Sequence, residues 1–302
     1  MKLVRYHYEK ERSYGVLSND DKIVCLPSLA RHMQKRLPKT FEEFIEKGEK
    51  AVKTAEELLK KATQSVVENV SLPINKVALL APIARPPKII CLGLNYADHI
   101  EERITEHGSL VPDEPIIFLK PHTTIIGPKE NIVKPSFVKQ LDYEAELAIV
   151  MGKKAKNVPV SEAKSYIFGY TILNDVSARD IQFKDKQWTR GKSFDTFAPT
   201  GPCIVTQNQL EDTSNLYVRT WVNNELRQDS TTKKMVFTVY EIVHHLSRVM
   251  TLEPCDIIAT GTPAGVGFAL KPEPKFLQAG DVVRMEIEKI GILENMVVEE
   301  KL

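Results

Sequence analysis

The sequence predicts a mixed α+β fold, mostly β, in which a small N-terminal α+β domain precedes a body of β-roll type. Short apolar or β-branched runs bounded by Gly, Pro, Asn or Asp recur along the chain. Few long helical patterns separate them, so the regular alternation of doubly wound sheets and α/β barrels is absent. Three prolines between Pro82 and Pro87 interrupt regular structure. They indicate a boundary between a first domain, residues 1–83, and a second, residues 84–302.

In the first domain, the runs at 2–8, 13–17 and 22–26 predict three short strands. Thr40 and Glu43 have the spacing of a capping box, which predicts a helix that continues to about Thr63 with apolar residues at helical intervals. In the second domain the pattern predicts eight strands, and the best helix candidate is 239–250. These strands are expected at 88–92, 116–120, 144–151, 167–173, 201–206, 217–222, 256–260 and 282–287.

Composition excludes several classes of protein. The 302 residues include 41 Lys and Arg against 40 Asp and Glu, a formal charge of +1, so nothing in the charge favours nucleic acid or an anionic membrane as partner. A hydrophobic fraction of 42% and a charged fraction of 27% are typical of globular domains rather than of disordered, collagen-like or coiled-coil chains.

Targeting and cysteine patterns point to a cytoplasmic protein. No apolar run approaches the ~20 residues that span a bilayer, and residues 1–10 lack the apolar stretch of a secretory signal. The four cysteines include no CxxC pair, which excludes a zinc ribbon or a thioredoxin-type site by spacing. We expect reduced thiols.

The most informative stretch carries three carboxylates. Asp142, Glu144 and Glu146 alternate with apolar residues, so in a strand they share one face, where like charges repel unless a cation neutralises them. A solvent-facing edge strand would show the same alternation, but residues 147–151 are continuously apolar, as in a buried strand. With Asp175, at the end of another apolar run, Glu144 and Glu146 would form an all-oxygen site that favours Mg²⁺ or Mn²⁺ over zinc.

A second candidate lies in the turn after the run 88–92. His99 and Glu102 are three residues apart, so on a helical turn they share a face. A carboxylate bonded to one ring nitrogen fixes the tautomer and raises the basicity of the other nitrogen, as deprotonation of a water requires. A surface ion pair is the alternative. Glu101 competes as the partner, but residues two apart do not face each other on a helix.

Further polar residues suggest anion recognition. Lys192 is either a solvated surface residue or a cation for an oxyanion or a substrate carboxylate. Arg179 and Gln182 suit the distal carboxylate of a substrate, and the Thr262 hydroxyl lies in a glycine-flanked turn that suits a ligand.

Two apparent motifs are excluded. The segment 191–193 ends like a phosphate-binding loop, but Lys186 stands where that motif requires glycine. The segment 261–265 has the spacing of a nucleophile elbow, but Pro263 replaces the serine.

Together these motifs resemble the fumarylacetoacetate hydrolase family. The matching segments are GLNYADHIEE (93–102), PIIFLKP (115–121), LDYEAELAIVMGK (141–153), IFGYTILNDVSARDIQ (167–182), GKSFDTFAPTGP (191–202) and IATGTPAGVG (258–267). The resemblance implies a mixed β-roll catalytic domain, usually dimeric, that binds Mg²⁺ or Mn²⁺, preceded by the smaller and more variable domain of longer members.

The resemblance also implies roles for single residues. Glu144, Glu146 and Asp175 would hold the metal, His99, Glu102 and Lys192 would be catalytic, and Arg179, Gln182 and Thr262 would contact substrate. The sequence shows no departure at the metal or His–Glu positions.

Members of this family hydrolyse acylpyruvates and fumarylacetoacetate, decarboxylate oxaloacetate, isomerise or decarboxylate 2-hydroxyhepta-2,4-diene-1,7-dioate, or dehydrate sugar acids. The leading hypothesis is hydrolytic C–C cleavage of an acylpyruvate-type 2,4-dioxo acid through a metal-stabilised enolate. In it, His99 oriented by Glu102 activates water, and Lys192 stabilises the oxyanion. Oxaloacetate decarboxylase and the heptadienedioate isomerase or decarboxylase are the alternatives.

We expect a homodimer that acts on a small 2-oxo acid and has no nucleic-acid or membrane partner. A scaffold without catalysis would be expected to lack His99 or Glu102, and both are present. The loops at 101–115 and 183–190, which would set the substrate's side chain, carry no readable motif.

Overall fold

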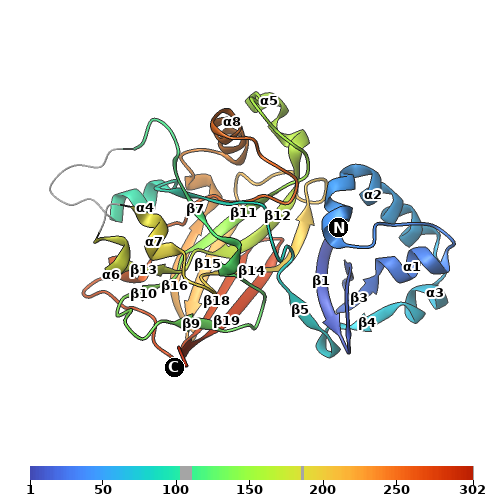
Figure 1. The fold of residues 1–302 in the computed structure, drawn as a ribbon, viewed down its shortest axis with the longest axis horizontal. Coiled ribbons are helices and arrows are strands. Elements are labelled where there is room, and N and C mark those ends of the chain that lie inside the picture. The colour runs from blue at the N-terminus through green and yellow to red at the C-terminus, as the bar shows by residue number, and fades with distance from the viewer. Residues whose placement is uncertain (103–110, 185–186, 302) are drawn as a thin grey trace.

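The computed structural model describes residues 1–102, 111–184 and 187–301. It confirms a mixed α+β architecture rich in strands. The N-terminal residues form a lobe at one end of the molecule, and the later strands build a larger body beside it (Figure 1).

The N-terminal lobe begins with an antiparallel meander of β1 (Lys2–Tyr8), β2 (Glu11–Leu17) and β3 (Lys22–Cys25). This confirms the three strands predicted there. The other elements of the lobe are helices α1 (Leu26–His32), α2 (Phe41–Lys61) and α3 (Gln64–Asn69) and strands β4 (Ser71–Pro73) and β5 (Ala78–Leu80).

Helix α2 begins where Thr40 and Glu43 predicted, but only half of the capping box forms. The Thr40 hydroxyl accepts a hydrogen bond from the backbone N–H of Glu43 at 3.2 Å. The Glu43 carboxylate accepts from the backbone N–H of Lys39, at 3.1 Å, rather than from that of Thr40. The helix is interrupted at Gly48, whose φ of 53° and ψ of −131° suit only glycine.

A large sheet runs through both parts of the molecule in the order β4-β3-β2-β1-β14-β12-β11-β17-β6-β7, with β5 beside β1 and β8 beside β14. Its body strands are β6 (Ile89–Gly93), β7 (Ile116–Lys120), β8 (Ile125–Ile126), β11 (Ala145–Met151), β12 (Ile167–Asn174), β14 (Ala198–Thr206) and β17 (Ile257–Ala259). Because β1 pairs antiparallel with β14, the lobe and the body share this sheet. A domain boundary at residue 83 stays a prediction.

Strand β11 is buried on both faces, which explains its continuous apolar run. Leu147, Ile149 and Met151 belong to one hydrophobic core, whereas Ala148 and Val150 belong to a second core on the other face, which includes side chains of the N-terminal lobe. The strand that carries the carboxylates is therefore held between two packed layers.

A second sheet has the order β16-β15-β18-β19-β9. Its members are β9 (Ile132–Lys134), β15 (Tyr217–Val222), β16 (Glu225–Thr231), β18 (Val282–Ile287) and β19 (Gly291–Glu299). The pattern missed β9, β16 and β19. A two-stranded ladder joins β10 (Leu141–Asp142) to β13 (Ser177–Ala178).

The helices of the body are short. They are α4 (Ala97–Glu102), α5 (Val160–Ala163), α6 (Arg179–Gln182), α7 (Trp188–Lys192) and α8 (Val239–Val249). The last of these confirms the helix predicted at 239–250. Turns of 3₁₀ helix lie at Ile74–Lys76, His122–Thr124, Lys164–Tyr166, Thr232–Lys234 and Gly267–Ala269. Figure 1 shows α4, α6 and α7 gathered at the end of the body far from the N-terminal lobe.

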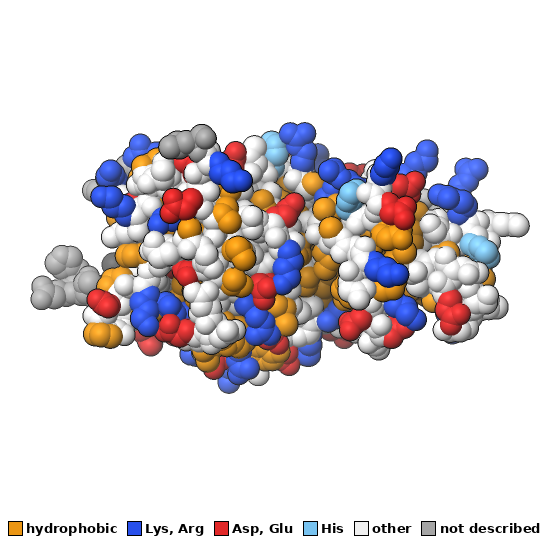
Figure 2. Space-filling view, turned by 90° about the horizontal axis from the view of Figure 1, so that it is seen from below, with side chains coloured by type: hydrophobic (Ala, Val, Ile, Leu, Met, Phe, Trp, Pro, Cys, Tyr) orange, Lys and Arg blue, Asp and Glu red, His pale blue; other side chains and the backbone are white. Residues whose placement is uncertain are grey.

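The surface carries charges of both signs (Figure 2), in line with the near-zero net charge of the sequence. Within residues 1–102, 111–184 and 187–301, no helix combines the length and apolar character that crossing a membrane requires. On the face shown in Figure 2, positive and negative side chains are interspersed with apolar ones. The four cysteines form no disulfide, as expected.

Replacing Phe44 with alanine is expected to lower the free energy of unfolding by about 3–5 kcal/mol, the usual effect of truncating a buried aromatic side chain. Phe44 of α2 is fully buried, and its ring lies 6.4 Å from that of Phe168 on β12, so it joins the lobe to the body. Urea denaturation would measure the change. Val249→Ala, at a side chain 66% exposed, is the control and should change the free energy by no more than about 0.5 kcal/mol. An equal effect of both variants would contradict this packing role.

Candidate active site

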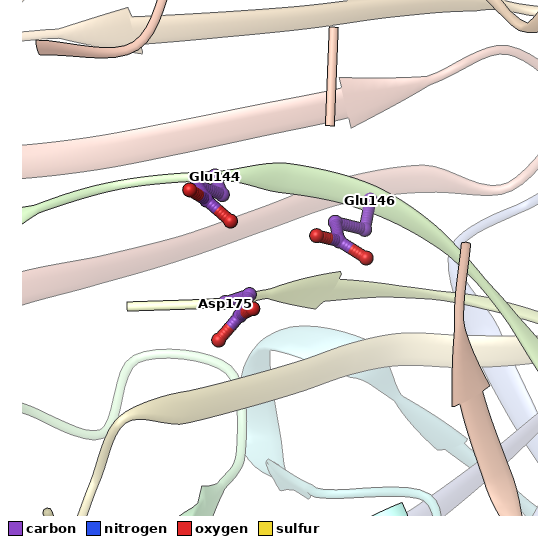
Figure 3. A group of neighbouring side chains, drawn as sticks. All are labelled: Glu144, Glu146 and Asp175. Carbon is purple, nitrogen blue, oxygen red and sulfur yellow. The ribbon is translucent and has the colours of Figure 1, made fainter. Parts of the chain in front are cut away.

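Three carboxylates meet where β11 begins and β12 ends (Figure 3). Antiparallel pairing aligns Ala145 with Asn174, which places Glu144 beside Asp175, and the N–H of Asp175 donates to the Glu144 carbonyl at 2.9 Å. One oxygen from each of Glu144, Glu146 and Asp175 lies within 4.8 Å of the others, and all three residues are buried. The structure therefore brings together the three residues predicted to hold a metal.

The electrostatics of this cluster differ between its members. Burial would raise the pKa of Glu144, but the positive charges of Lys192 and Arg179 outweigh burial and hold that pKa well below its ordinary value. Burial and the charges of Asp175 and Glu144 raise the pKa of Glu146 well above its ordinary value. Its Oε2 accepts from the N–H of Gly261 at 2.7 Å.

The donor set fits a divalent cation. The second oxygen of Glu146, Oε1, is buried and has no hydrogen-bond partner among the described residues, and buried polar atoms without partners are rare in proteins. An ion placed among the three carboxylates would satisfy this atom and remove the repulsion within the cluster. The ligands are all oxygen, which suits Mg²⁺ or Mn²⁺.

Asp142 does not join this cluster, contrary to the predicted alternation of three carboxylates on one face. The strand is interrupted between β10 and β11, so the alternation does not continue from Asp142 to Glu144. Asp142 instead accepts from the Nε of Arg179 at 2.8 Å and from the backbone N–H groups of Gly267 and Phe268. It anchors Arg179 rather than a metal.

Lys192 and Arg179 are buried and both contact the cluster. The Lys192 Nζ lies 2.7 Å from Glu144 Oε2 and 2.8 Å from Asp175 Oδ2, and Arg179 Nη2 lies 2.6 Å from Glu144 Oε1. Burial lowers the pKa of Lys192, but the charges of Asp175 and Glu144 outweigh burial and raise it above its ordinary value, so the ammonium stays charged. Neither residue is a solvated surface residue.

Sequence reasoning missed Lys120. This residue ends β7, and its fully buried Nζ donates to Asp175 Oδ1 at 2.5 Å and to the Val176 carbonyl at 3.2 Å. Phe118 lies two residues earlier, on the same face of the strand, and Lys192 Nζ lies 5.3 Å from the centre of its ring. The sequence feature that could have identified it is a lysine at the end of an otherwise apolar strand, Ile116–Lys120.

His99 and Glu102 on α4 form the predicted pair. His99 is buried, and its Nδ1 lies 2.6 Å from Glu102 Oε1. An ionised carboxylate can only accept a hydrogen bond, so Nδ1 carries a proton, and in the neutral ring this leaves the lone pair on Nε2. Glu102 Oε2 accepts from the N–H of Gly265 at 2.8 Å. A carboxylate fixed at both oxygens thus orients the base.

The turn 261–265 contacts both the carboxylate cluster and the His99–Glu102 pair. Gly261 adopts a φ of 91°, which glycine tolerates, and directs its N–H at Glu146, while Gly265 at the other end donates to Glu102. The Thr262 hydroxyl between them donates to the Ala145 carbonyl and accepts from the buried Gln228. The metal cluster and the His–Glu pair are therefore positioned by the same five residues.

Part of this site lines one narrow cavity of about 20 Å³, room for about one water molecule. The predicted residues at its wall are His99, Glu144, Arg179, Gln182, Lys192 and Thr262. Gln182 accepts from Arg179 Nη1 at 2.9 Å, so two of the three predicted substrate-binding side chains bond each other. Residues 103–110 and 185–186 of the loops predicted to set the substrate lie outside the described residues.

The family model described as fumarylacetoacetate (FAA) hydrolase C-terminal matches residues 88–298. The chain belongs to the fumarylacetoacetate hydrolase family. This confirms the resemblance drawn from the motifs, and it makes the chain a member of an enzyme family with a known fold.

Several relatives indicate the range of chemistry around this family member. A mitochondrial oxaloacetate tautomerase of Rattus norvegicus is 44% identical over 263 residues, which cover 87% of this chain and 80% of that protein. The 2-hydroxyhepta-2,4-diene-1,7-dioate isomerase of Mycobacterium marinum is 36% identical with a TM-score of 0.75, and each chain is covered completely. Maleylpyruvate hydrolase of Sphingobium sp. SYK-6, solved with manganese(II) and pyruvate, is 29% identical with a TM-score of 0.79, again over both whole chains.

These relatives correct one prediction. The expected cytoplasmic location is wrong, because the oxaloacetate tautomerases of rat, cattle and human that resemble this family member are mitochondrial proteins. The absence of a secretory signal says nothing about import into an organelle.

Proposed function

We propose that this protein is a Mg²⁺- or Mn²⁺-dependent enzyme that interconverts the keto and enol forms of oxaloacetate. The observation that carries the proposal is that an oriented base, His99, lines the same cavity as Glu144, a member of a carboxylate cluster suited to a hard dication. The rat relative named as an oxaloacetate tautomerase supports the choice of substrate.

Glu144, Glu146 and Asp175 would hold the metal. A dication bound there would polarise the 2-oxo group of the substrate and make a proton on its C3 more acidic.

His99 Nε2 would then accept the C3 proton, and the C–H electron pair would form the C2–C3 double bond as the C=O π electrons move to the 2-oxo oxygen. The imidazolium would then give a proton to that oxygen, which restores the neutral base and completes the enol. Glu102 would stabilise the imidazolium that forms. The ammonium group of Lys192 would balance negative charge on the substrate oxygen. Arg179, Gln182 and Thr262 would contact the distal carboxylate, after exchange of their present hydrogen bonds.

Hydrolysis of an acylpyruvate is the second candidate. The same His99–Glu102 pair can deprotonate a water molecule, and the cavity has room for about one. The likeness to maleylpyruvate hydrolase supports this candidate. Decarboxylation of oxaloacetate would need the polarised 2-oxo group but no attacking water.

A substrate panel on chelator-treated protein, with and without Mg²⁺ or Mn²⁺, tests the proposal. Loss of the enol's ultraviolet absorbance reports tautomerisation of oxaloacetate, and pyruvate release from oxaloacetate or acetylpyruvate reports cleavage. We expect metal-dependent tautomerisation to be the fastest reaction. Faster pyruvate release from acetylpyruvate would favour hydrolysis, and faster release from oxaloacetate would favour decarboxylation; either result would overturn the tautomerase proposal.

We also propose that the protein is a homodimer, as the family resemblance implies. The exposed apolar side chains Ile292 and Met296 on β19 are compatible with burial against a second copy. Light scattering on the purified protein should give twice the mass of one chain, and a value for a single chain would contradict the proposal.

Replacing Asp98 with asparagine is expected to lower turnover about tenfold, or about 1.4 kcal/mol, without changing metal affinity. Asp98 precedes His99 and accepts from Ser230 at 2.6 Å and from Lys234 at 3.0 Å, so it fixes α4 against β16 and the segment after it. The amide keeps the shape but loses the charge that Lys234 pairs with. Steady-state kinetics and Mn²⁺ titration would measure both quantities. Asp229→Asn, which removes an exposed partner of Arg219, is the control; an equal loss there would contradict the role of Asp98.

A further inference from the structure

Cations of the chain itself hold all four oxygens of two of the proposed metal ligands. Glu144 Oε1 forms an ion pair with Arg179 Nη2 at 2.6 Å, and Oε2 bonds Lys192 at 2.7 Å. Asp175 Oδ1 bonds Lys120 and Oδ2 bonds Lys192, at 2.5 and 2.8 Å. A dication that takes an oxygen of Glu144 or Asp175 must therefore compete with an ammonium or guanidinium group already there.

Glu146 differs from the other two ligands. Its Oε2 bonds only a backbone N–H, that of Gly261, and its Oε1 has no partner among the described residues. A dication can reach Glu146 without displacing any cation. The competition is confined to Glu144 and Asp175.

The charge balance of the cluster, counted together with the adjoining Asp142, explains why an anion should bind with the metal. Four buried carboxylates, those of Asp142, Glu144, Glu146 and Asp175, face three buried cations, those of Lys120, Arg179 and Lys192. This leaves at most one excess negative charge. A dication alone would leave one excess positive charge in a buried site, which is unfavourable. A dianion that binds with the metal would restore the original balance.

Metal binding at Asp175 would affect Lys120 more than the other two cations. The Lys120 side chain is fully buried, and among the described residues it bonds the Val176 carbonyl, at 3.2 Å, as its one partner besides Asp175. If the metal takes the Asp175 oxygen, the ammonium group loses its one charged partner, and a buried ammonium without a counter-ion is costly. A ligand carboxylate in the cavity would supply the new counter-ion.

We propose that Lys120, together with Lys192, acts as an internal counter-ion that makes the divalent metal and a dianionic 2-oxo acid bind cooperatively. The inference rests on the proposed metal-dependent function and goes beyond it, because it assigns Lys120 a role in coupling two ligands. Coupling of this kind is reciprocal: the metal must tighten binding of the anion by the same factor.

The first test uses the unmodified protein. Mn²⁺ binding to chelator-treated protein would be measured by electron paramagnetic resonance of free Mn²⁺, alone, with saturating oxalate, and with oxamate, which has the same shape but one negative charge. Protein-free blanks would correct for soluble Mn²⁺ complexes. We expect oxalate to tighten Mn²⁺ binding at least about tenfold and oxamate to do so less. Equal Mn²⁺ affinity with and without oxalate would overturn the inference.

The second test replaces Lys120 with methionine, which keeps the volume and removes the charge. We expect this variant to bind Mn²⁺ about tenfold more tightly than the unmodified protein in the absence of oxalate, and to show a smaller gain on adding oxalate. A residue that merely supported Asp175 would have the opposite effect, because its loss would weaken Mn²⁺ binding; that result would also overturn the inference.

The matched control is Lys88→Met. Lys88 likewise pairs with a buried aspartate, Asp256, at 2.8 Å, but outside the cluster, so this variant should leave Mn²⁺ affinity and its response to oxalate unchanged. The two proposals fail in distinguishable ways. If the unmodified protein binds no Mn²⁺ under any condition, the proposed function fails as well. If turnover requires Mn²⁺ but oxalate does not change Mn²⁺ affinity, only the coupling inference fails.

Discussion

Replacing Glu146 with glutamine is expected to abolish detectable Mn²⁺ binding and to lower turnover at least about 10³-fold, since it removes one of three charged ligands of the proposed site. The amide oxygen can still accept the hydrogen bond that Gly261 donates to Glu146 Oε2 at 2.7 Å, so the turn 261–265 should keep its place. Calorimetric titration with Mn²⁺ and a metal-dependent turnover assay would measure the two effects.

The same variant is expected to be more stable than the unmodified protein when both are free of metal. Burial and two neighbouring carboxylates raise the pKa of Glu146 in the folded state. A carboxyl group with a raised folded-state pKa destabilises the fold increasingly as pH rises above its unfolded-state pKa, because the unfolded chain releases that proton more easily. Glutamine has no such proton, so at neutral pH Glu146→Gln should unfold at a higher urea concentration.

The control for this prediction is Glu294→Gln, which removes a half-buried carboxylate paired with Lys129 on the second sheet. It should leave Mn²⁺ binding and turnover unchanged. Retention of tight Mn²⁺ binding by Glu146→Gln would show that the cluster does not hold the ion through this residue. Loss of function with gain of stability is the pattern expected of a site whose charges are arranged for a ligand rather than for folding.

The metal cluster could be predicted because it depends on short-range rules. Side chains two residues apart in a strand share a face whatever the rest of the fold does, so Glu144 and Glu146 were recognisable as a pair. Asp175 could be added because it ends an apolar run, and strand ends carry functional residues. The register that places Asp175 beside Glu144 appears only in the structure.

Asp142 and Lys120 show where this reasoning fails. The alternation rule assumes an unbroken strand. The residues from Leu141 to Ala145 give no sign of the break between β10 and β11, after which Asp142 pairs with Arg179. Lys120 contacts Asp175 from a strand 55 positions earlier in the chain. Contacts between residues so far apart depend on the order of the strands in the sheet, which a single sequence does not show.

Hydropathy missed a strand that packs against polar groups near the site. Strand β16 buries Gln228 and Ser230, and Gln228 donates to Thr262 beside the site while accepting from the backbone N–H of Ala145. A strand that buries polar side chains to support a polar site has no alternating apolar pattern, so hydropathy does not identify it as a strand.

Replacing His99 with asparagine is expected to lower turnover by about 10²–10⁴-fold, the usual contribution of a positioned general base. Mn²⁺ affinity should change little, because His99 does not belong to the carboxylate cluster. The asparagine amide can still donate to Glu102, which in turn holds Gly265 at 2.8 Å, so the geometry around the cluster should persist. Turnover and Mn²⁺ titration on the same preparation would separate loss of the base from loss of the ion.

His244→Asn provides the matched control, since His244 also bonds through its Nδ1, at 2.7 Å to the Val158 carbonyl, but lies on α8 outside the cavity. It should retain turnover. If His99→Asn kept more than about a tenth of normal turnover while binding Mn²⁺ normally, His99 would not be the base. Proton transfer would then have to be assigned to another group at the cavity, such as Lys192, which contacts both Glu144 and Asp175. The charge-balancing role proposed for that ammonium would then fail as well.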